Sequence, residues 1–197
     1  MFTFRNEFLS LTENNQFRSS QLTRSGETLC VIAKNRNRMK TIDKNISTFG
    51  LLTELTNSQT DNFEIIKNHW KKFNAELKKY NLIQKGGNWE KYGITIKTNE
   101  TYFYLTTIPQ DKMIFPEHFV NKEIPKGDYE IFTHTGKMEN IKQTIYHIYK
   151  NILPNSNLTI EHYSKTGFIH FEKYDYRFSW DKPTSKIDIY LPVKTNN

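Results

Sequence analysis

The fold is decided by YEIFTHTGKMENIKQTIYHIYKNILPNSNL, residues 129–158, and by two segments that follow it, GFIHFEKYD (167–175) and SKIDIYLPV (185–193). Residues 129–135 predict a strand that ends at Gly136. Apolar residues then recur every three or four positions, which predicts an amphipathic helix, at Met138, Ile141, Ile145, Ile148 and Ile152. The helix ends at Pro154-Asn155-Ser156, and strands at 168–174 and 187–193 complete the unit.

The first half of the chain carries a similar series. A helix is predicted by apolar residues at the same three- and four-residue spacing, namely Phe63, Ile66, Trp70, Phe73 and Leu77. Asp61 is the expected N-cap, with Glu64 as its capping-box partner. Strands at 92–96 and 101–108 follow this helix, and the short apolar run Leu29–Ala33 predicts a strand before it. We expect 34–60 to be a loop, apart from a short element at 49–55, and 109–125 to be a connector.

Strand, helix, strand, strand therefore occurs twice, at about 29–108 and 128–193. Two such units bury their apolar helix faces against a shared antiparallel sheet. The sequence predicts an α+β domain with pseudo-two-fold symmetry, in which two helices pack on one sheet face and a ligand cleft lies between the halves. We expect residues 1–27 to form a polar N-terminal extension and 28–197 to form the domain.

Composition restricts the class of protein. Aromatic residues make up 14% of the chain and supply much of the apolar area, since hydrophobic residues total only 36%. The single cysteine, Cys30, excludes an internal disulfide and favours a reducing compartment. No signal peptide and no apolar run of membrane-spanning length are visible, so we expect a cytoplasmic protein without membrane contact.

Glu172 is the residue on which the functional prediction depends. Alternation along its strand places Phe168, His170, Glu172 and Tyr174 on one side and Ile169 and Phe171 on the other. If Ile169 and Phe171 pack on the helices, Glu172 faces the cleft. A carboxylate in this position is either an ordinary exposed strand residue or the charge partner of a lipophilic cation, which neighbouring rings would also attract. In the second case, burial would raise the pKa of Glu172.

Aromatic residues around Glu172 are the candidate walls of the pocket. Four tyrosines fall in predicted strands and could share one side, namely Tyr92, Tyr104, Tyr174 and Tyr190. Tyrosines in strands are, however, more often plain core or sheet-surface residues. Trp89 follows the Gly86-Gly87 turn and either covers the core or lines the pocket rim, whereas Trp180 is a candidate rim residue or lid.

Several other chemistries lack their signatures. The six histidines show no metal-ligand spacing, so we expect no metal site. Gly86-Gly87 lacks the rest of a phosphate-binding loop, Cys30 has no visible catalytic partner, and we expect no cofactor. The net charge of +7 permits nucleic-acid binding, but no recognition motif accompanies it, and the lysines of the first helix are consistent with a solvated face.

The second half resembles a known family in the order and spacing of its segments. These are YEIFTHTG at 129–136 before a helix, LPNS at 153–156, FEKY at 171–174 and IDIYLPV at 187–193. Together they resemble the gyrase-inhibitor-like domain, also called the AraC-type effector-binding domain, over roughly 27–194. The resemblance implies the duplicated unit described above, and the first half departs from it at residues 34–60.

The resemblance implies a ligand sensor of the kind found in multidrug transcription regulators, with Glu172 in a pocket for bulky, often cationic, aromatic compounds. We therefore expect a stand-alone small-molecule-binding domain, without direct DNA binding but with scope for a protein partner. One alternative is a hydrolase of strained or electrophilic toxins, with Glu172 as base and a tyrosine as acid. The other is a protein that acts on gyrase or nucleic acid through the basic helix, residues 61–80.

Overall fold

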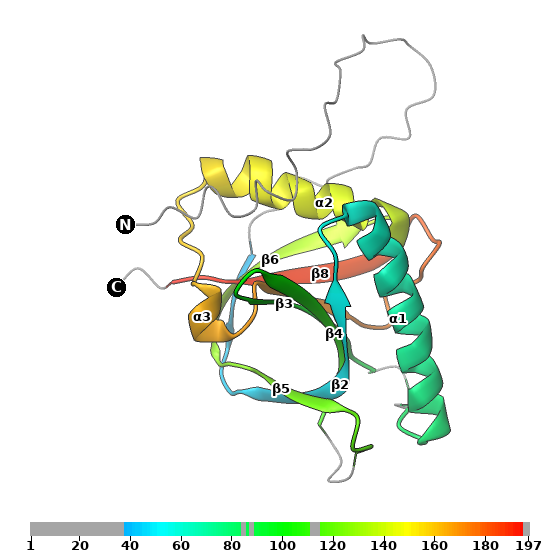
Figure 1. The fold of residues 1–197 in the computed structure, drawn as a ribbon. Helices are drawn as coiled ribbons and strands as arrows, with labels where there is room; N and C mark the ends of the chain where they lie inside the picture. Colours follow the sequence, from blue (N-terminus) through cyan, green and yellow to red (C-terminus); the bar gives the residue numbers. More distant parts are fainter. Residues whose placement is uncertain (1–37, 84–85, 87–88, 111–114, 195–197) are drawn as a thin grey trace, which may run out of the picture.

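A computed structural model describes residues 38–83, 86, 89–110 and 115–194. The strands are β1 (Arg38–Ile42), β2 (Ile46–Leu55), β3 (Lys91–Thr98), β4 (Thr101–Pro109), β5 (Val120–Ile124), β6 (Gly127–Thr135), β7 (His170–Tyr174) and β8 (Lys186–Pro192). The helices are α1 (Gln59–Lys79), α2 (Ile141–His147) and α3 (Tyr163–Thr166). Three short helical segments adjoin α2, namely η1 (Met138–Asn140), η2 (Ile148–Ile152) and η3 (Leu153–Asn155). Figure 1 shows their arrangement.

The expected duplication is confirmed. The eight strands of the described residues form one antiparallel sheet in the order β1-β6-β8-β7-β3-β4-β2-β5. The units β2-α1-β3-β4 and β6-α2-β7-β8 occupy equivalent places on either side of the β3–β7 pair. The pseudo-two-fold axis therefore passes between β3 and β7, and Glu172, whose register partner is Gly93, lies at the centre of the sheet.

The sheet is strongly curled, as its connections require. β1 and β2 are six strand positions apart in the sheet, which is about 29 Å if the sheet were flat. The chain between Ile42 and Ile46 spans at most about 14 Å. β5 and β6 are also six positions apart and are joined by only two residues. Both connections close only if the two ends of the sheet approach each other, and the curl is visible in Figure 1.

Two of our expectations about loops are wrong. The segment 34–60, which we expected to be a loop apart from a short element at 49–55, holds β1 and the ten-residue strand β2, and the connector at 109–125 holds β5. The short element at 49–55 is part of β2. β1 and β5 are short, polar and mostly exposed, so period-two apolar alternation does not reveal them. β2 takes the place in the first unit that we assigned to Leu29–Ala33. That run, Cys30 and the extension at 1–27 lie outside the described residues.

The helix α1 and the α2–η2 segment cover the outer face of the curled sheet (Figure 1). On that face Trp70, Phe73 and Leu77 of α1 pack against Leu51 and Tyr104. The inner face of the curl has its own aromatic core, which includes Tyr92, Tyr129, Phe168, Phe171 and Tyr190. A third cluster, with Phe132 and Ile148, lies under α2 and η2. The sheet is thus apolar on both faces, which explains the high aromatic content.

The N-terminal end of α1 differs from the prediction. Its N-cap is Ser58, whose side-chain oxygen accepts a hydrogen bond from the Asp61 backbone N–H at 3.3 Å. Asp61 instead lies in the first helical turn, where its charge favours the helix dipole. Glu64 pairs with Lys67 rather than closing a capping box. The helix therefore begins two residues before the cap that the sequence suggested.

Candidate functional site

A pocket lies between α1 and α2 on the outer face of the sheet, over the centre of the pseudo-symmetric arrangement. It leaves a cavity of about 170 Å³ with mainly apolar walls. Its lining residues are Leu55, Thr56, Asn62, Phe63, Ile66, Thr95, Tyr102, Met138, Ile141, Lys142, Ile145, Tyr146, Tyr149, Lys150, Glu172 and Trp180. The two helices supply the walls, and β3, β4 and β7 supply the floor.

Glu172 belongs to this floor and forms the centre of a hydrogen-bond cluster. Its carboxylate Oε2 accepts a hydrogen bond from the Tyr104 hydroxyl at 2.5 Å and another from the Tyr174 hydroxyl at 2.6 Å. The Trp70 indole N–H donates to the Tyr104 oxygen at 3.3 Å. Glu172 is only 4% exposed, so these two tyrosine hydroxyls replace much of the water that a free carboxylate would bind.

Gly93 makes this cluster possible. A Cβ atom at that position would lie 2.0 Å from the Tyr104 hydroxyl oxygen and 2.8 Å from Oε2 of Glu172. Glycine therefore leaves the space on β3 through which Tyr104 of β4 reaches Glu172 of β7. The three strands that meet at the pseudo-symmetry axis build the cluster together.

The electrostatics of the floor oppose a charge that lacks a partner. Burial raises the pKa of Glu172 above its ordinary value, and the two tyrosine hydrogen bonds lower it again in part. Burial and the neighbouring carboxylate raise the pKa values of Tyr104 and Tyr174 well above the ordinary range, so both remain hydroxyl donors. Within the described residues, no cationic side chain forms an ion pair with Glu172.

His170 supports the pocket from below. It is 3% exposed, and its Nδ1 lies 2.9 Å from the hydroxyl of Tyr149, which lines the pocket from η2. Its Nε2 lies 3.3 Å from the Thr95 hydroxyl. Burial lowers the pKa of His170 to about 4, so the imidazole is neutral at physiological pH. We infer that His170 holds Tyr149 in place rather than supplying charge.

Aromatic rings connect the floor to one side of the pocket. Tyr174 packs edge-on against Phe178 at 4.9 Å between ring centroids, and Phe178 packs edge-on against Trp180 at 6.3 Å. Trp180 also contacts Phe63 of α1 at 6.4 Å. Its backbone carbonyl accepts a hydrogen bond from Met138 N–H at 2.9 Å, which ties this wall to η1. Trp180, which we expected to be a rim residue or a lid, lines the pocket.

The structure separates the residues that we expected to share one face. Glu172, Tyr174, Tyr104 and His170 lie together on the outer face, where the helices pack. The condition under which we expected Glu172 to face the cleft is not met, because the curl buries the Phe171 side inside the sheet and the helices pack on the other side. The pocket nevertheless lies on the same sheet face as Glu172. It forms between the two helices that pack on this face, and not on a face that the helices leave uncovered.

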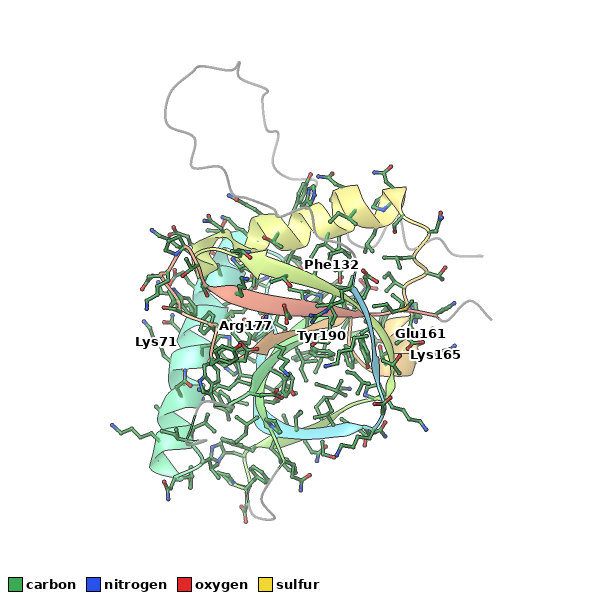
Figure 2. The ribbon with its side chains drawn as sticks, turned by 180° about the vertical axis from the view of Figure 1, so that it is seen from behind. Lys71, Phe132, Glu161, Lys165, Arg177 and Tyr190 are labelled. Atoms are coloured by element: carbon green, nitrogen blue, oxygen red, sulfur yellow. The ribbon has the colours of Figure 1, made fainter. Side chains whose placement is uncertain are left out.

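Tyr92, Tyr190 and Phe168 lie on the inner face, away from the pocket. Tyr92 is in register with Lys173 rather than with Glu172, so its side chain points the opposite way. Tyr190, labelled in Figure 2, stacks on Phe171 at 4.5 Å inside the curl. Phe168 precedes β7, so strand alternation does not extend to it. Trp89 packs against the outer core and does not line the pocket.

Sequence reasoning missed the helical walls. Ile141, Ile145 and Tyr149 of the α2–η2 segment line the pocket at four-residue intervals. The spacing of Ile141 and Ile145 predicted a buried helix face, but it did not include Tyr149 and did not show that part of this face borders a cavity. The π-helical turn η2, a feature often found at functional sites, brings in Tyr149 and Lys150 and has no clear sequence signature.

Two kinds of feature are absent from the described residues. None of their helices is both long and apolar enough to cross a membrane. In the same part of the chain, no three His, Cys, Asp or Glu side chains gather in a way that could hold a metal ion.

Comparison with known proteins identifies the family. The transcriptional regulator BrlR of Pseudomonas aeruginosa is 31% identical over 105 residues, which cover 52% of this chain and only 37% of the regulator. The structure of SAV2435 bound to tetraphenylphosphonium has a TM-score of 0.62 at 14% identity and covers 81% of this chain and 94% of its own. Integron cassette protein VCH_CASS2 of Vibrio cholerae has a TM-score of 0.53 at 16% identity, covering 81% and 97%.

At these identities the two structures show a shared fold. The family model named Cass2, which describes an integron-associated effector-binding protein, matches residues 38–193 and hence both repeat units. The expected effector-binding family, which is related to transcription regulators, is confirmed. The chain belongs to the family of integron-associated effector-binding proteins.

Proposed function

We propose that this domain binds bulky amphipathic compounds with a positive charge, in the pocket between α1 and α2, and that Glu172 is the charge partner of the ligand. The observation that carries the proposal is a buried carboxylate at the floor of an apolar, aromatic-lined pocket. The tetraphenylphosphonium bound to SAV2435, a protein of the same fold, is a ligand of this chemical class and supports the proposal.

The physical argument concerns the cost of the buried carboxylate. Tyr104 and Tyr174 stabilise the charge but donate to the same oxygen, Oε2, and neither carries a positive charge. A lipophilic cation would complete the neutralisation, and the rings of Trp180 and Tyr102 would add cation–π attraction. Apolar enclosure by the helices would supply most of the affinity and little shape selectivity.

The test is a titration of tryptophan fluorescence with tetraphenylphosphonium, because Trp180 lines the pocket and Trp70 contacts the cluster. Hydrogen bonds and ion pairs to a buried charge contribute about 1.5–3 kcal/mol, so Glu172→Gln is expected to weaken binding by roughly ten- to a hundredfold. Glu130→Gln is the matched control, since Glu130 is equally buried on β6 but does not line the pocket. Equal affinity in wild type and Glu172→Gln would refute the proposal.

A second candidate function rests on the same cluster. Glu172, with its raised pKa, lies within hydrogen-bond distance of two tyrosine hydroxyls, an arrangement that suits acid–base catalysis. As a hydrolase, Glu172 would take a proton from water as its oxygen adds to a strained electrophilic carbon, and a tyrosine would protonate the departing atom. Product formation from such a substrate, abolished in Glu172→Gln but retained in Glu130→Gln, would favour this function over binding alone.

A further inference from the structure

Two lysines that line the pocket differ from Glu172 in both charge and burial. Lys142 of α2 is exposed and Lys150 of η2 is partly exposed, whereas Glu172 is 4% exposed. The described residues include no ion-pair partner for either lysine. Other lysines are paired, such as Lys173 with Glu90 and Lys165 with Glu161. The pocket thus has a negative floor and two uncompensated positive charges near its mouth.

The two lysines lie on one helical segment beside the pocket. Lys142, Tyr146 and Lys150 follow one another at intervals of four residues along α2 and the π-helical turn η2, and all three line the pocket. At 1.5 Å per residue, the two lysine Cα atoms are about 12 Å apart. Tyr146 lies between them and is 51% exposed, which offers a ring surface at the mouth. The mouth therefore combines an aromatic surface with two ammonium groups.

This layout discriminates between ligands that all carry a cation. A compound whose only charge is positive gains from Glu172 but brings a like charge past Lys142 and Lys150. A compound with a cation at one end and an anion at the other matches the floor and the mouth together. We propose that the ligands that this pocket prefers are amphipathic zwitterions, in which an aromatic body separates a cationic group from a carboxylate, sulfonate or phosphate. The inference rests on the proposed function for its cationic half.

The test compares rhodamine B with its ethyl ester. The two dyes share the cationic aromatic body, but the ester lacks the free carboxylate. The measured quantity is the ratio of dissociation constants, ester over acid, in wild type and in the double variant Lys142→Met/Lys150→Met. Methionine keeps the apolar stem and removes the charge. Because the ratio is compared between proteins, the greater hydrophobicity of the ester cancels.

Partly exposed ion pairs are each worth a factor of a few in affinity, so we expect the ratio to fall about fivefold in the double variant. The fall is expected to shrink in 1 M salt, where the Debye length is about 3 Å. Lys71→Met is the control, because Lys71 lies on the outer side of α1, away from the pocket lining (Figure 2). Its ratio is expected to equal that of wild type.

The outcomes separate this inference from the proposed function. If Glu172→Gln weakens both dyes but the ratio is unchanged in Lys142→Met/Lys150→Met, the zwitterion preference is refuted and the cation pocket stands. If Glu172→Gln weakens neither dye, or if neither binds wild type, the proposed function fails and the inference fails with it. A ratio that falls equally in Lys71→Met would show a general effect of net charge and would also overturn the inference.

Discussion

Gly93→Ala is expected to damage both stability and ligand binding, although it adds only one methyl group. The new Cβ would lie 2.0 Å from the Tyr104 hydroxyl oxygen and 2.6 Å from its Cζ atom. An ordinary contact needs at least 3.4 Å, so the end of the Tyr104 ring would have to move by about 1.4 Å (3.4 − 2.0). Tyr104 is 1% exposed, so the core leaves it little room to move.

The energetic cost has two parts. Overpacking of a dense core costs about 1–3 kcal/mol, and displacement of the hydroxyl weakens a hydrogen bond to a carboxylate worth about 1.5–3 kcal/mol. Relaxation recovers some of this, so we expect a loss of about 2–4 kcal/mol in the free energy of unfolding. Denaturant unfolding measures that loss, and titration with tetraphenylphosphonium measures the accompanying loss of affinity.

A second-site change provides the control for Gly93→Ala. Tyr104→Leu removes the two atoms with which the new methyl group collides most severely, and only Oε2 of Glu172, at 2.8 Å, remains too close. In that background, Gly93→Ala is expected to cost much less than it does in the wild type, because the Glu172 side chain alone has to move and alanine is at least as favourable as glycine in a strand. Wild-type stability and affinity in the single Gly93→Ala variant would refute the packing argument for the cluster.

Three further predictions concern the cluster and the helix beside it. Affinity for tetraphenylphosphonium is expected to fall as pH falls through the raised pKa of Glu172, at a midpoint above its ordinary 4.5. Tyr174→Phe is expected to move that midpoint upwards, because it removes a hydrogen bond that lowers the pKa of Glu172. Titrations of the two proteins at several pH values measure this shift, and equal midpoints would show that the bond is unimportant. Because the pKa of Glu172 is raised in the folded state, ionisation of Glu172 destabilises the fold once the pH exceeds the unfolded pKa. The free energy of unfolding of Glu172→Gln, taken relative to wild type at the same pH, is therefore expected to be higher at pH 8 than at pH 4. A difference between the two proteins that does not change with pH would contradict this. Ser58→Ala is expected to cost about 1 kcal/mol of stability through loss of the α1 N-cap while leaving affinity unchanged. Thermal unfolding measures the stability and titration measures the affinity, and unchanged stability or reduced affinity would contradict the prediction.

Much of the fold follows from local patterns. The apolar stripes of α1 and of the α2 segment, the alternation in β3, β4 and β8, and the repeat itself are all visible in the residues. β1 and β5 are not, because edge strands with polar, exposed residues carry no apolar period. The short β1–β2 and β5–β6 connections require the curl. This requirement becomes visible only when the strand order is known, because the order places the connected strands far apart in the sheet.

The candidate site was only partly predictable for a related reason. Strand alternation correctly groups Glu172 with His170 and Tyr174, since all three belong to β7. It cannot relate one strand to another, because that requires the register. Gly93, rather than Tyr92, pairs with Glu172, and this single step places Tyr92 inside the curl. The wall residues Tyr149 and Lys150 depend on the π-helical turn, which the sequence does not signal.

The central claim is that Glu172 gives the pocket its preference for positive charge. Tetraphenylphosphonium and tetraphenylborate have nearly the same size and shape and opposite charges, so the ratio of their dissociation constants isolates the electrostatic contribution. The decisive measurement is this ratio, by calorimetry, in wild type and Glu172→Gln. We expect the preference for the cation to fall by at least tenfold in Glu172→Gln and to remain in Glu130→Gln. An unchanged ratio in Glu172→Gln would contradict the claim.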